Sequence, residues 1–197
     1  GDVLKARNRA WVLSSWQVVV GEYAKMGKEI KITTLPYEFK GFMGMRNFII
    51  QDSEGRKLAW ANSNWTHLDI STGLPARLTP ADTDNYVLGE KMEMDYAPRK
   101  IKLPEDMIAQ EAFTVQKHHL DTNHHVNNCQ YVCMAEDFLP ESFKIYQMRA
   151  EYKMQAKLGD VICPKVKTET DKVVVSLDNI EGKAYAIVEF LKKEGDI

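Results

Sequence analysis

The sequence has few cysteines, little net charge and no long hydrophobic run. Its 197 residues include three cysteines, an odd number without the spacing of a disulfide framework, which favours a reducing compartment. The net charge of −2 gives no basic field of the kind that nucleic-acid-binding proteins present. No apolar run approaches the length of a membrane span, and the first ten residues carry no signal-peptide pattern. We therefore expect a cytosolic protein with no membrane span and no nucleic-acid partner.

The chain is long enough for one large domain or two small ones, and an internal repeat favours two. Residues 23–30 (YAKMGKEI) match residues 155–162 (QAKLGDVI) at an offset of 132. Further along, EGR at 54–56 matches EGK at 181–183 at an offset of 127. The matches come in the same order, and the difference between the offsets is an ordinary change of loop length. We interpret the chain as two copies of one architecture.

Each copy is predicted to form antiparallel strands. Residues 29–39 alternate at their start between Ile and polar residues, and residues 11–23 are rich in aromatic and β-branched side chains, as strands are. The loop at 53–56 (SEGR) has the length and the glycine of a hairpin turn. The expected strands are 11–23, 29–39, 45–52 and 57–68 in the first copy, and 143–156, 161–170, 172–178 and 184–193 in the second.

The second copy has an additional opening strand and a helix. Residues 111–120 are predicted to be a strand, and residues 126–139 a helix that Pro140 ends. This is the plan of an α+β fold in which an antiparallel sheet wraps around a central helix. At the offset of 132, the counterpart of this strand and helix would lie before Gly1. We therefore expect the first copy to be N-terminally incomplete and the chain to be part of a longer protein.

Domain boundaries follow from this pattern. Residues 79–111 contain Pro80, Pro98 and Pro104 with several acids and no sustained period, which is typical of a linker. We therefore predict a first domain over residues 1–78, a linker over 79–111 and a second domain over 112–197.

The stretch HHLDTNHHVNNCQYV at 118–132 allows three functional interpretations. A zinc site would draw on His125, Cys129 and Cys133, which lie four residues apart on the predicted helix. A nucleophile would be Cys129 with His125 as its base. Both cysteines, however, are expected on the buried, apolar face of the helix, where they would be packed core thiols.

The third interpretation is a hydrolytic site at the tip of the helix. Asp121, Asn123 and His125 alternate along a segment that ends where the predicted helix begins, so they could face one side. They offer an acid/base group, an amide and a titratable imidazole. The first N–H groups of the helix would bind the oxyanion that forms when a carbonyl is attacked. The alternative without chemistry is a helix-capping turn rich in Asp and Asn.

The motif D-x-N-x-H-V-N-N-x-x-Y resembles the active-site signature of the acyl-acyl-carrier-protein thioesterases. It is formed here by Asp121, Asn123, His125, Val126, Asn127, Asn128 and Tyr131. Residues 7–18, 44–65 and 151–160 are also similar to segments of that family. The resemblance implies a tandem hotdog fold without a metal, in which each antiparallel sheet wraps around a long helix.

The resemblance also implies a reaction, which is hydrolysis of the fatty acyl-acyl carrier protein thioester to free fatty acid and holo-acyl carrier protein. No cofactor is expected, because the substrate carries its own phosphopantetheine. Asn123 would position substrate or water, His125 would polarise it or act as base, and Asp121 would tune the network, with the last two roles open to exchange. The backbone N–H groups of Val126 and Asn127 would stabilise the oxyanion.

One position departs from the family pattern. Family members commonly carry an acid on the strand after the helix, and the matching residue here is Gln155, followed by Ala156. A glutamine orients a water but cannot deprotonate it, and a general base is worth ~10²–10⁴ in rate. Three functions therefore stay open: an acyl-acyl carrier protein hydrolase, a non-catalytic hotdog protein that binds acyl thioesters as a sensor or carrier, and an acyl-coenzyme A thioesterase.

The implied partner, acyl carrier protein, is strongly acidic, so a basic docking patch is expected. Two clusters would supply it: Lys5, Arg7 and Arg9, or Arg99, Lys100 and Lys102. The acyl chain needs an apolar tunnel, and its expected lining is Trp11, Trp16, Met43, Met45 and Trp60. A monomer is expected if the tandem hotdog imitates within one chain the dimer of single hotdogs, and a homodimer is expected if edge strands pair two chains.

Overall fold

The computed structural model describes residues 7–192, which form two compact units. The first unit is Gly1–Ala97 and the second is Pro98–Ile197. Both consist of an antiparallel sheet with few helices, which confirms the predicted α+β class. No helix in the described part of the chain is long and apolar enough to cross a membrane.

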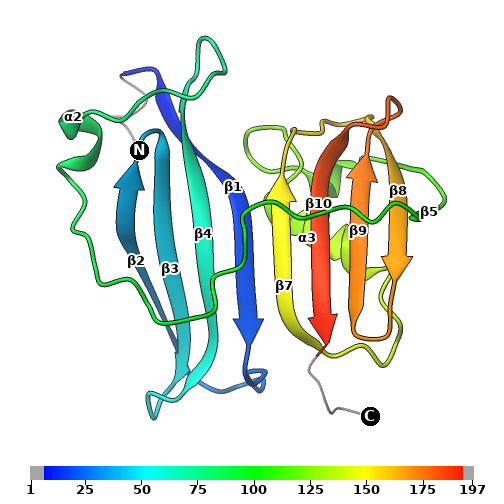
Figure 1. Cartoon of the computed structure of the whole chain (residues 1–197), viewed down its shortest axis with the longest axis horizontal. Coiled ribbons are helices and arrows are strands. Elements are labelled where there is room, and N and C mark those ends of the chain that lie inside the picture. The colour runs from blue at the N-terminus through cyan, green and yellow to red at the C-terminus, as the bar shows by residue number, and fades with distance from the viewer. Residues whose placement is uncertain (1–6, 193–197) are drawn as a thin grey trace. The chain divides into compact units, whose positions relative to one another are not determined.

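The first unit is a four-stranded antiparallel sheet (Figure 1). Its strands are β1 (Arg9–Val20), β2 (Ile30–Lys40), β3 (Met43–Asp52) and β4 (Lys57–Asp69), in the spatial order β2-β3-β4-β1. The predicted hairpin turn joins β3 to β4, and its Gly55 has a φ of 80°, a left-handed conformation that glycine adopts without a steric penalty. After β4 the chain forms the short helix α2 (Pro80–Thr83).

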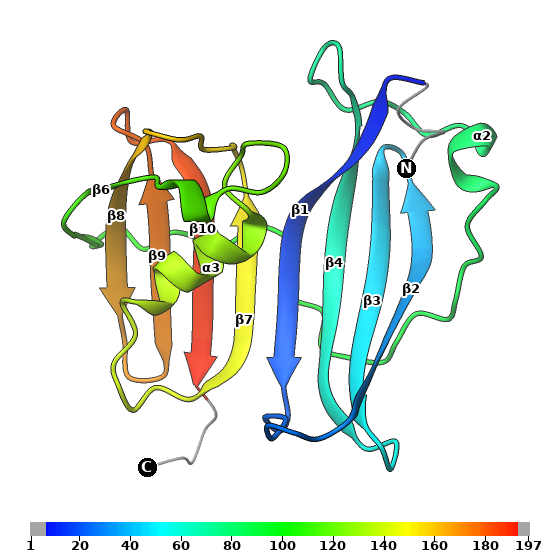
Figure 2. The same cartoon turned by 180° about the vertical axis from the view of Figure 1, so that it is seen from behind.

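The second unit has a similar sheet with a helix on one face (Figure 2). Its long strands are β7 (Ile145–Tyr152), β8 (Val161–Thr168), β9 (Lys172–Asp178) and β10 (Ala184–Lys192), in the order β7-β10-β9-β8. Two short strands, β5 (Ile108–Ala109) and β6 (Phe113–Thr114), pair with β8. A 3-10 turn (Lys117–His119) and the helix α3 (Asn128–Glu136) follow β6, and α3 contacts β9 and β10.

The two sheets share their strand order and their register, as the internal repeat predicts. In the first unit, Arg46 of β3 is paired with Ser63 of β4. At the offset of 127, Val173 of β9 is paired with Phe190 of β10. Within residues 7–97 there is no counterpart of β6 or α3.

The core of the second unit holds α3 in place. The inner strands β9 and β10 contribute six side chains that are 0% exposed, namely Val173, Val175, Leu177, Ala186, Val188 and Phe190. From the helix, Tyr131 and Ala135 are 1% and 0% exposed. Fully burying an aliphatic or aromatic side chain of this size contributes about 1.5–3 kcal/mol, so this packing fixes the helix and, with it, the loop that precedes the helix.

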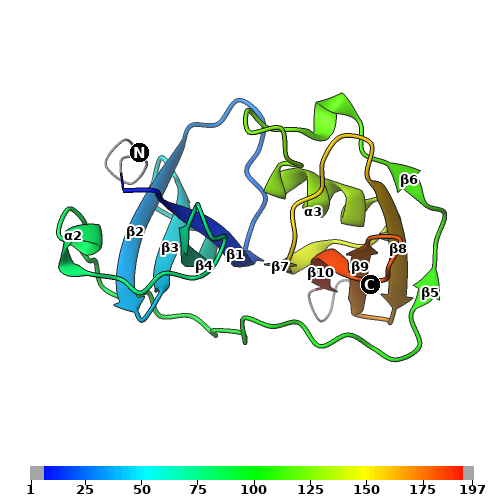
Figure 3. The same ribbon diagram turned by 90° about the horizontal axis from the view of Figure 1, so that it is seen from above.

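The segment expected to be a surface linker is anchored by hydrogen bonds to each sheet. In the first unit, Gln17 Nε2 donates to the carbonyl of Asp95 (2.7 Å), and Gln17 Oε1 accepts the N–H of Ala97 (2.9 Å). In the second unit, Arg149 Nη2 donates to the carbonyl of Pro98 (2.5 Å). Figure 3 shows that, in the second unit, this segment and α3 lie on opposite faces of the sheet.

Two predicted elements are shorter than expected. In the range 111–120, where one opening strand was predicted, the structure has only the two-residue strand β6 and the 3-10 turn. The helix predicted over 126–139 spans only α3. Val126 lies before the helix. Its backbone is extended and forms an antiparallel bridge with Leu120. The helix therefore begins later than predicted, which changes the backbone groups available at its tip.

Candidate active site

The loop before α3 is organised by the carboxylate of Asp121. Its Oδ1 accepts the backbone N–H groups of Asn123 (2.8 Å) and His125 (3.3 Å), and its Oδ2 accepts from Asn123 Nδ2 (3.4 Å). The N–H of Asp121 donates to the carbonyl of His125 at 2.8 Å, which closes the loop. At its tip, His124 has a φ of 60°, a left-handed conformation that is uncommon outside glycine. These bonds are those of a polar turn, and they gather Asn123 and His125 around one carboxylate.

Hydrogen bonding also sets the ionisation of Asp121. Partial burial alone would raise its pKa, but the N–H donors of Asn123 and His125 outweigh this effect, so the pKa of Asp121 lies below its ordinary value. A carboxylate of low pKa is ionised at neutral pH and is a weak proton acceptor, whereas an imidazole is suited to that task. Asn123 is exposed and His125 half-buried, so the arrangement favours His125 as the base and Asp121 as the group that shapes the loop.

The N–H groups of Val126 and Asn127 already donate within the fold. Val126 donates to the carbonyl of Ala156, and Asn127 donates to the carbonyl of His119, both at 2.9 Å. This corrects the expectation that these two groups hold an oxyanion, because neither is open in this geometry. The next N–H, that of Asn128, is the first of α3 and has no acceptor within residues 7–192, as the geometry of a helix terminus dictates.

Asn127 has a different function, which is to cap α3. Its backbone is extended, with φ −62° and ψ 139°, and its side chain accepts the N–H of Cys129 at 2.9 Å. An N-cap of this type satisfies one of the unpaired donors of the first turn. The cap fixes the residue at which the helix starts and leaves the Asn128 N–H at the positive end of the helix dipole.

One residue, Ala156, ties the Gln155 segment to the loop through both of its backbone polar groups. The carbonyl of Ala156 accepts from the loop, as described above, and the N–H of Ala156 donates to Oη of Tyr131 at 2.8 Å. His125 and Lys157 also form an isolated antiparallel bridge. Gln155, which is exposed, immediately precedes Ala156. The position at which family members commonly carry an acid therefore lies in the segment that runs alongside His125.

Tyr131 is a positioning residue that the sequence analysis missed. It belongs to the motif, but the motif alone does not indicate that its hydroxyl holds Ala156. Tyr131 is 1% exposed and Ala156 is 0% exposed, so their hydrogen bond is shielded from water. Burial raises the pKa of Tyr131 to about 12, which keeps the hydroxyl neutral. A hydroxyl on the buried face of a helix is the signal that could have predicted such a bond.

The cysteines do not occupy the core positions that were predicted for them. Cys129 and Cys133 are exposed, because the face of α3 that carries them does not pack on the sheet. Partial burial and the neighbouring Cys129 raise the pKa of Cys133, which opposes formation of a thiolate. No group of three or more His, Cys, Asp or Glu side chains that could hold a metal ion occurs in the part of the chain that the structure describes.

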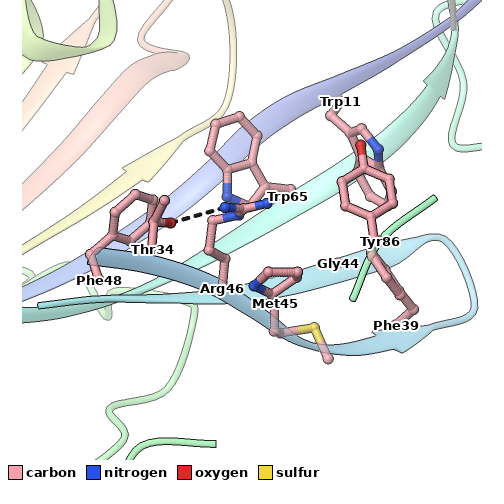
Figure 4. Close-up of a pocket in the computed structure, with 10 residues that line it drawn as sticks. Trp11, Thr34, Phe39, Gly44, Met45, Arg46, Phe48, Trp65 and Tyr86 are labelled. Carbon is pink, nitrogen blue, oxygen red and sulfur yellow. Dashed lines mark hydrogen bonds between the residues drawn. The ribbon is translucent and has the colours of Figure 1, made fainter. Parts of the chain in front are cut away.

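The first unit contains a pocket of about 330 Å³ (Figure 4). Of the residues predicted to line an acyl tunnel, Trp11 and Met45 line this pocket. The other three, Trp16, Met43 and Trp60, are not part of its wall. Two of the five residues predicted to line an acyl tunnel therefore form part of the wall of this pocket.

The two predicted basic clusters differ in their availability. Arg7 is paired with Asp82 (3.2 Å) and Arg9 with Asp69, whereas Lys5 lies outside the described residues. The second cluster is exposed and forms no ion pair with any described residue: Arg99, Lys100 and Lys102. Only the second cluster therefore presents unpaired positive charge.

The architecture defines a tandem hotdog, since an antiparallel sheet wraps around a helix in the second unit and the same sheet recurs in the first. Solved structures share this fold. An acyl-ACP thioesterase from Bacteroides thetaiotaomicron superposes with a TM-score of 0.86 at 19% identity, over 96% of this chain and 79% of that one. The 12:0-ACP thioesterase from Umbellularia californica gives a TM-score of 0.76 at 19% identity, over 96% and 77%.

Sequence comparison identifies the family. The acyl-ACP thioesterase N-terminal domain matches residues 1–86, and the acyl-ACP thioesterase C-terminal domain matches residues 101–190. The chain therefore belongs to the acyl-ACP thioesterase family, as its motif indicated. A chloroplastic palmitoyl-acyl carrier protein thioesterase from Arabidopsis thaliana is 25% identical over 168 residues, which are 79% of this chain. The chain spans 40% of the length of that relative.

Proposed function

We propose that the protein hydrolyses the thioester of fatty acyl-acyl carrier protein and releases free fatty acid and holo-acyl carrier protein. The observation that supports this most strongly is the family match over both halves of the chain. The chemistry is supported by the loop of Asp121, Asn123 and His125, which lies directly before α3.

In the proposed mechanism, His125 accepts the proton of the attacking water. Asn123 orients the water or the thioester, and Asp121 holds both residues through the bonds to their N–H groups. The oxyanion that forms on the thioester carbonyl accepts from the N–H of Asn128, the first open donor of α3. Gln155 donates to or accepts from the water but takes no proton.

Departure of the thiol leaving group requires little assistance from the protein. A thiol with an ordinary pKa of ~8.5 leaves more readily than an amine would, so acid assistance matters less than the activation of water. The thioester is carried by the phosphopantetheine of the substrate, and the proposed reaction needs no metal and no further cofactor. We place the reaction in the cytosol, on a monomer or homodimer, with acyl carrier protein as the macromolecular partner.

The proposed docking patch for acyl carrier protein consists of Arg99, Lys100 and Lys102. These side chains are exposed and carry unpaired positive charge, which complements an acidic partner. Charge of this kind acts mainly on the association rate and is screened by salt. Acyl-coenzyme A, the alternative carrier, offers no protein surface for the patch to bind.

The test is thiol release by the full chain from acyl-acyl carrier protein and acyl-coenzyme A esters of equal chain length. The proposal expects a higher kcat/KM on the carrier protein, and a smaller preference as salt rises. Turnover of acyl-coenzyme A esters alone would mean that coenzyme A, and not acyl carrier protein, carries the acyl chain of the substrate. Absence of turnover with both carriers would contradict the proposal that the protein is a thioester hydrolase.

The second candidate is a non-catalytic protein that binds acyl thioesters. It is favoured by Gln155, which cannot act as a base at the position where relatives commonly carry an acid. Saturable binding of an acyl-acyl carrier protein without thiol release would support this candidate. The same binding followed by thiol release would reject it.

A further inference from the structure

Two of the three cysteines lie one helical turn apart on α3. Cys129 and Cys133 are both exposed, whereas Cys163 on β8 is partly buried. Side chains at positions i and i+4 of a helix lie one above the other on the same face, and each is tilted toward the start of the helix. The helix therefore presents two accessible thiols side by side.

These two thiols take no part in packing the helix on the sheet. The buried residues of α3 are Tyr131, Met134 and Ala135, and Figure 2 shows that the helix lies on one face of the sheet. Both cysteines occupy the opposite side of the helix, because a period of 3.6 residues places each of them about 160° from Tyr131. Cysteine is among the most frequently buried residue types, so core packing does not explain a pair of cysteines at these positions.

Cys129 acts on the ionisation of Cys133. Partial burial raises the pKa of Cys133, and the charge and hydrogen bonding of Cys129 raise it further. Cys133 therefore keeps its proton while Cys129 is ionised. Cys129 is the second residue of α3 and lies at the positive end of the helix dipole, where an anion is favoured. The pair therefore offers one thiol suited to attack and a protonated thiol beside it.

A disulfide between the two thiols is within reach, but its closure requires the helix to move. Four residues of an α-helix advance about 6 Å along the axis, and bridged cysteines have Cα atoms ~4.4–6.8 Å apart. The Cβ atoms of such helical neighbours are ~5–6 Å apart, whereas a disulfide needs ~3.5–4.5 Å. Closure therefore shortens this separation by about 1 Å, and the movement falls on the start of α3.

We propose that Cys129 and Cys133 form a reversible disulfide when they react with a peroxide, and that its closure deforms the start of α3. The thiolate of Cys129 attacks one oxygen of hydrogen peroxide, an S–O bond forms as the O–O bond breaks, and the departing hydroxide takes up the proton that Cys129 released. The sulfur of Cys133 then attacks that of the sulfenic acid, an S–S bond forms as the S–O bond breaks, and hydroxide leaves with the Cys133 proton. Two thiols are oxidised, and one peroxide is reduced to two waters.

The deformation falls on the part of α3 that the candidate active site uses. Asn127 caps the helix through the N–H of Cys129, and the open N–H of Asn128 lies between them in the sequence. Strained and exposed disulfides are readily reduced, and disulfides in a reducing compartment are usually transient ones of this kind. The disulfide does not depend on the proposed hydrolysis, whereas its effect on turnover rests on that function.

The experiment is peptide mapping of the full chain after treatment with hydrogen peroxide and alkylation of the remaining thiols. Trypsin releases residues 118–144 as one peptide that contains Cys129 and Cys133 but not Cys163. This peptide should lose the mass of two hydrogen atoms and resist alkylation, and a thiol reductant should reverse both changes. Cys163→Ser is the matched control and should form the same disulfide. Cys133→Ser should stop at a sulfenic acid on Cys129, which dimedone traps.

The disulfide is rejected if the peptide keeps two thiols at peroxide concentrations that oxidise free glutathione, if it is linked to Cys163 or to a second chain, or if Cys163→Ser forms no disulfide. Hydrogen exchange of the reduced and the oxidised chain tests the deformation. Protection of the α3 amides should fall at least ~5-fold on oxidation, the equivalent of a lost N-cap, while that of the β9 amides is unchanged. Equal protection of α3 in both states would overturn the deformation.

Thiol release from acyl-acyl carrier protein tests the effect on the candidate active site. If the start of α3 holds the oxyanion, kcat should fall at least ~10-fold on oxidation and return on reduction, whereas Cys133→Ser should keep its kcat through the same treatment. An equal kcat in oxidised and reduced wild type would reject this effect. A chain that forms the disulfide but releases no thiol in either state contradicts only the proposed hydrolysis. An active hydrolase whose peptide keeps both thiols contradicts only the disulfide.

Discussion

The backbone N–H of Val126 donates to the carbonyl oxygen of Ala156, and the two atoms are 2.9 Å apart. This bond joins the end of the His125 loop to the segment that carries Gln155. The whole of α3 and of β7 lies between the two segments in the sequence, yet the segments are adjacent in the fold.

Replacing Asn127 by alanine should destabilise the second unit. The side chain caps α3 by accepting the N–H of Cys129, and loss of such a cap costs about 1 kcal/mol. Urea unfolding measures the loss. Asn127→Ser is the control, because a serine caps as well and should retain most of the stability. Equal losses in both variants would mean that the cap is not what Asn127 contributes.

Tyr131→Phe removes the acceptor of the buried Ala156 N–H. A buried donor left without a partner costs about 1–3 kcal/mol, and the Gln155 segment should loosen. Hydrogen exchange at the Ala156 amide is the direct readout, and its protection should fall by more than the global loss of stability explains. Tyr152→Phe removes a different hydroxyl that contacts the helix start and should leave the Ala156 amide protected. Equal protection of that amide in Tyr131→Phe and wild type would refute the clamp.

The raised pKa of Tyr131 predicts that the protein loses stability at alkaline pH. The folded-state pKa of Tyr131 is raised to about 12 by burial, above the ~10 of an unfolded chain. The contribution of the Tyr131 hydroxyl to the free energy of unfolding is therefore fully present below pH ~10 and is lost as the pH rises through the folded-state pKa. Urea unfolding at several alkaline pH values should show wild type falling toward Tyr131→Phe. A constant difference between the two over this range would contradict the assignment.

The strands and the motif could be predicted from the sequence, because both rest on local patterns. Alternation in residues 29–39 and the β-branched runs of the second copy predicted strands that the structure contains. The repeat also predicted two copies of one architecture, and the structure contains the same order of strands in both units. Asp121, Asn123 and His125 share one loop, as their spacing suggested.

The remaining features depend on contacts that no local pattern contains. Val126 is apolar and continues the helical period, but its N–H pairs with Ala156, so the helix starts after it. The exposure of Cys129 depends on what packs against α3, which the helix sequence does not specify. The anchoring of the linker needs Gln17, a residue far away in the sequence.

Asp121→Asn should distinguish an organising carboxylate from a base. The asparagine keeps an acceptor for the N–H groups of Asn123 and His125 but has no charge and takes no proton. If Asp121 shapes the loop, Asp121→Asn keeps much of the kcat for acyl-acyl carrier protein, while Asp121→Ala loses it. Equally severe losses in both variants would make Asp121 the base, with the roles of Asp121 and His125 exchanged.

Gln155→Glu should raise the rate, because it adds a group that accepts a proton beside the proposed water. A general base is typically worth ~10²–10⁴, and a gain of at least ~10-fold in kcat is expected here. The gain should disappear at low pH, where the new carboxylate is protonated. Gln155→Met is the control of similar size without a polar group. An unchanged kcat in Gln155→Glu would place the water away from this residue.

The central claim is that His125 activates water for hydrolysis of acyl-acyl carrier protein, and its most direct test is kcat/KM for thiol release in His125→Ala. The account predicts a fall of at least ~10²-fold, the lower bound for loss of a general base. His124→Asn is the matched control, since it changes the neighbouring histidine to a residue that tolerates the same left-handed backbone, and it should retain wild-type activity. Wild-type activity in His125→Ala, or an equal loss in His124→Asn, would contradict the account.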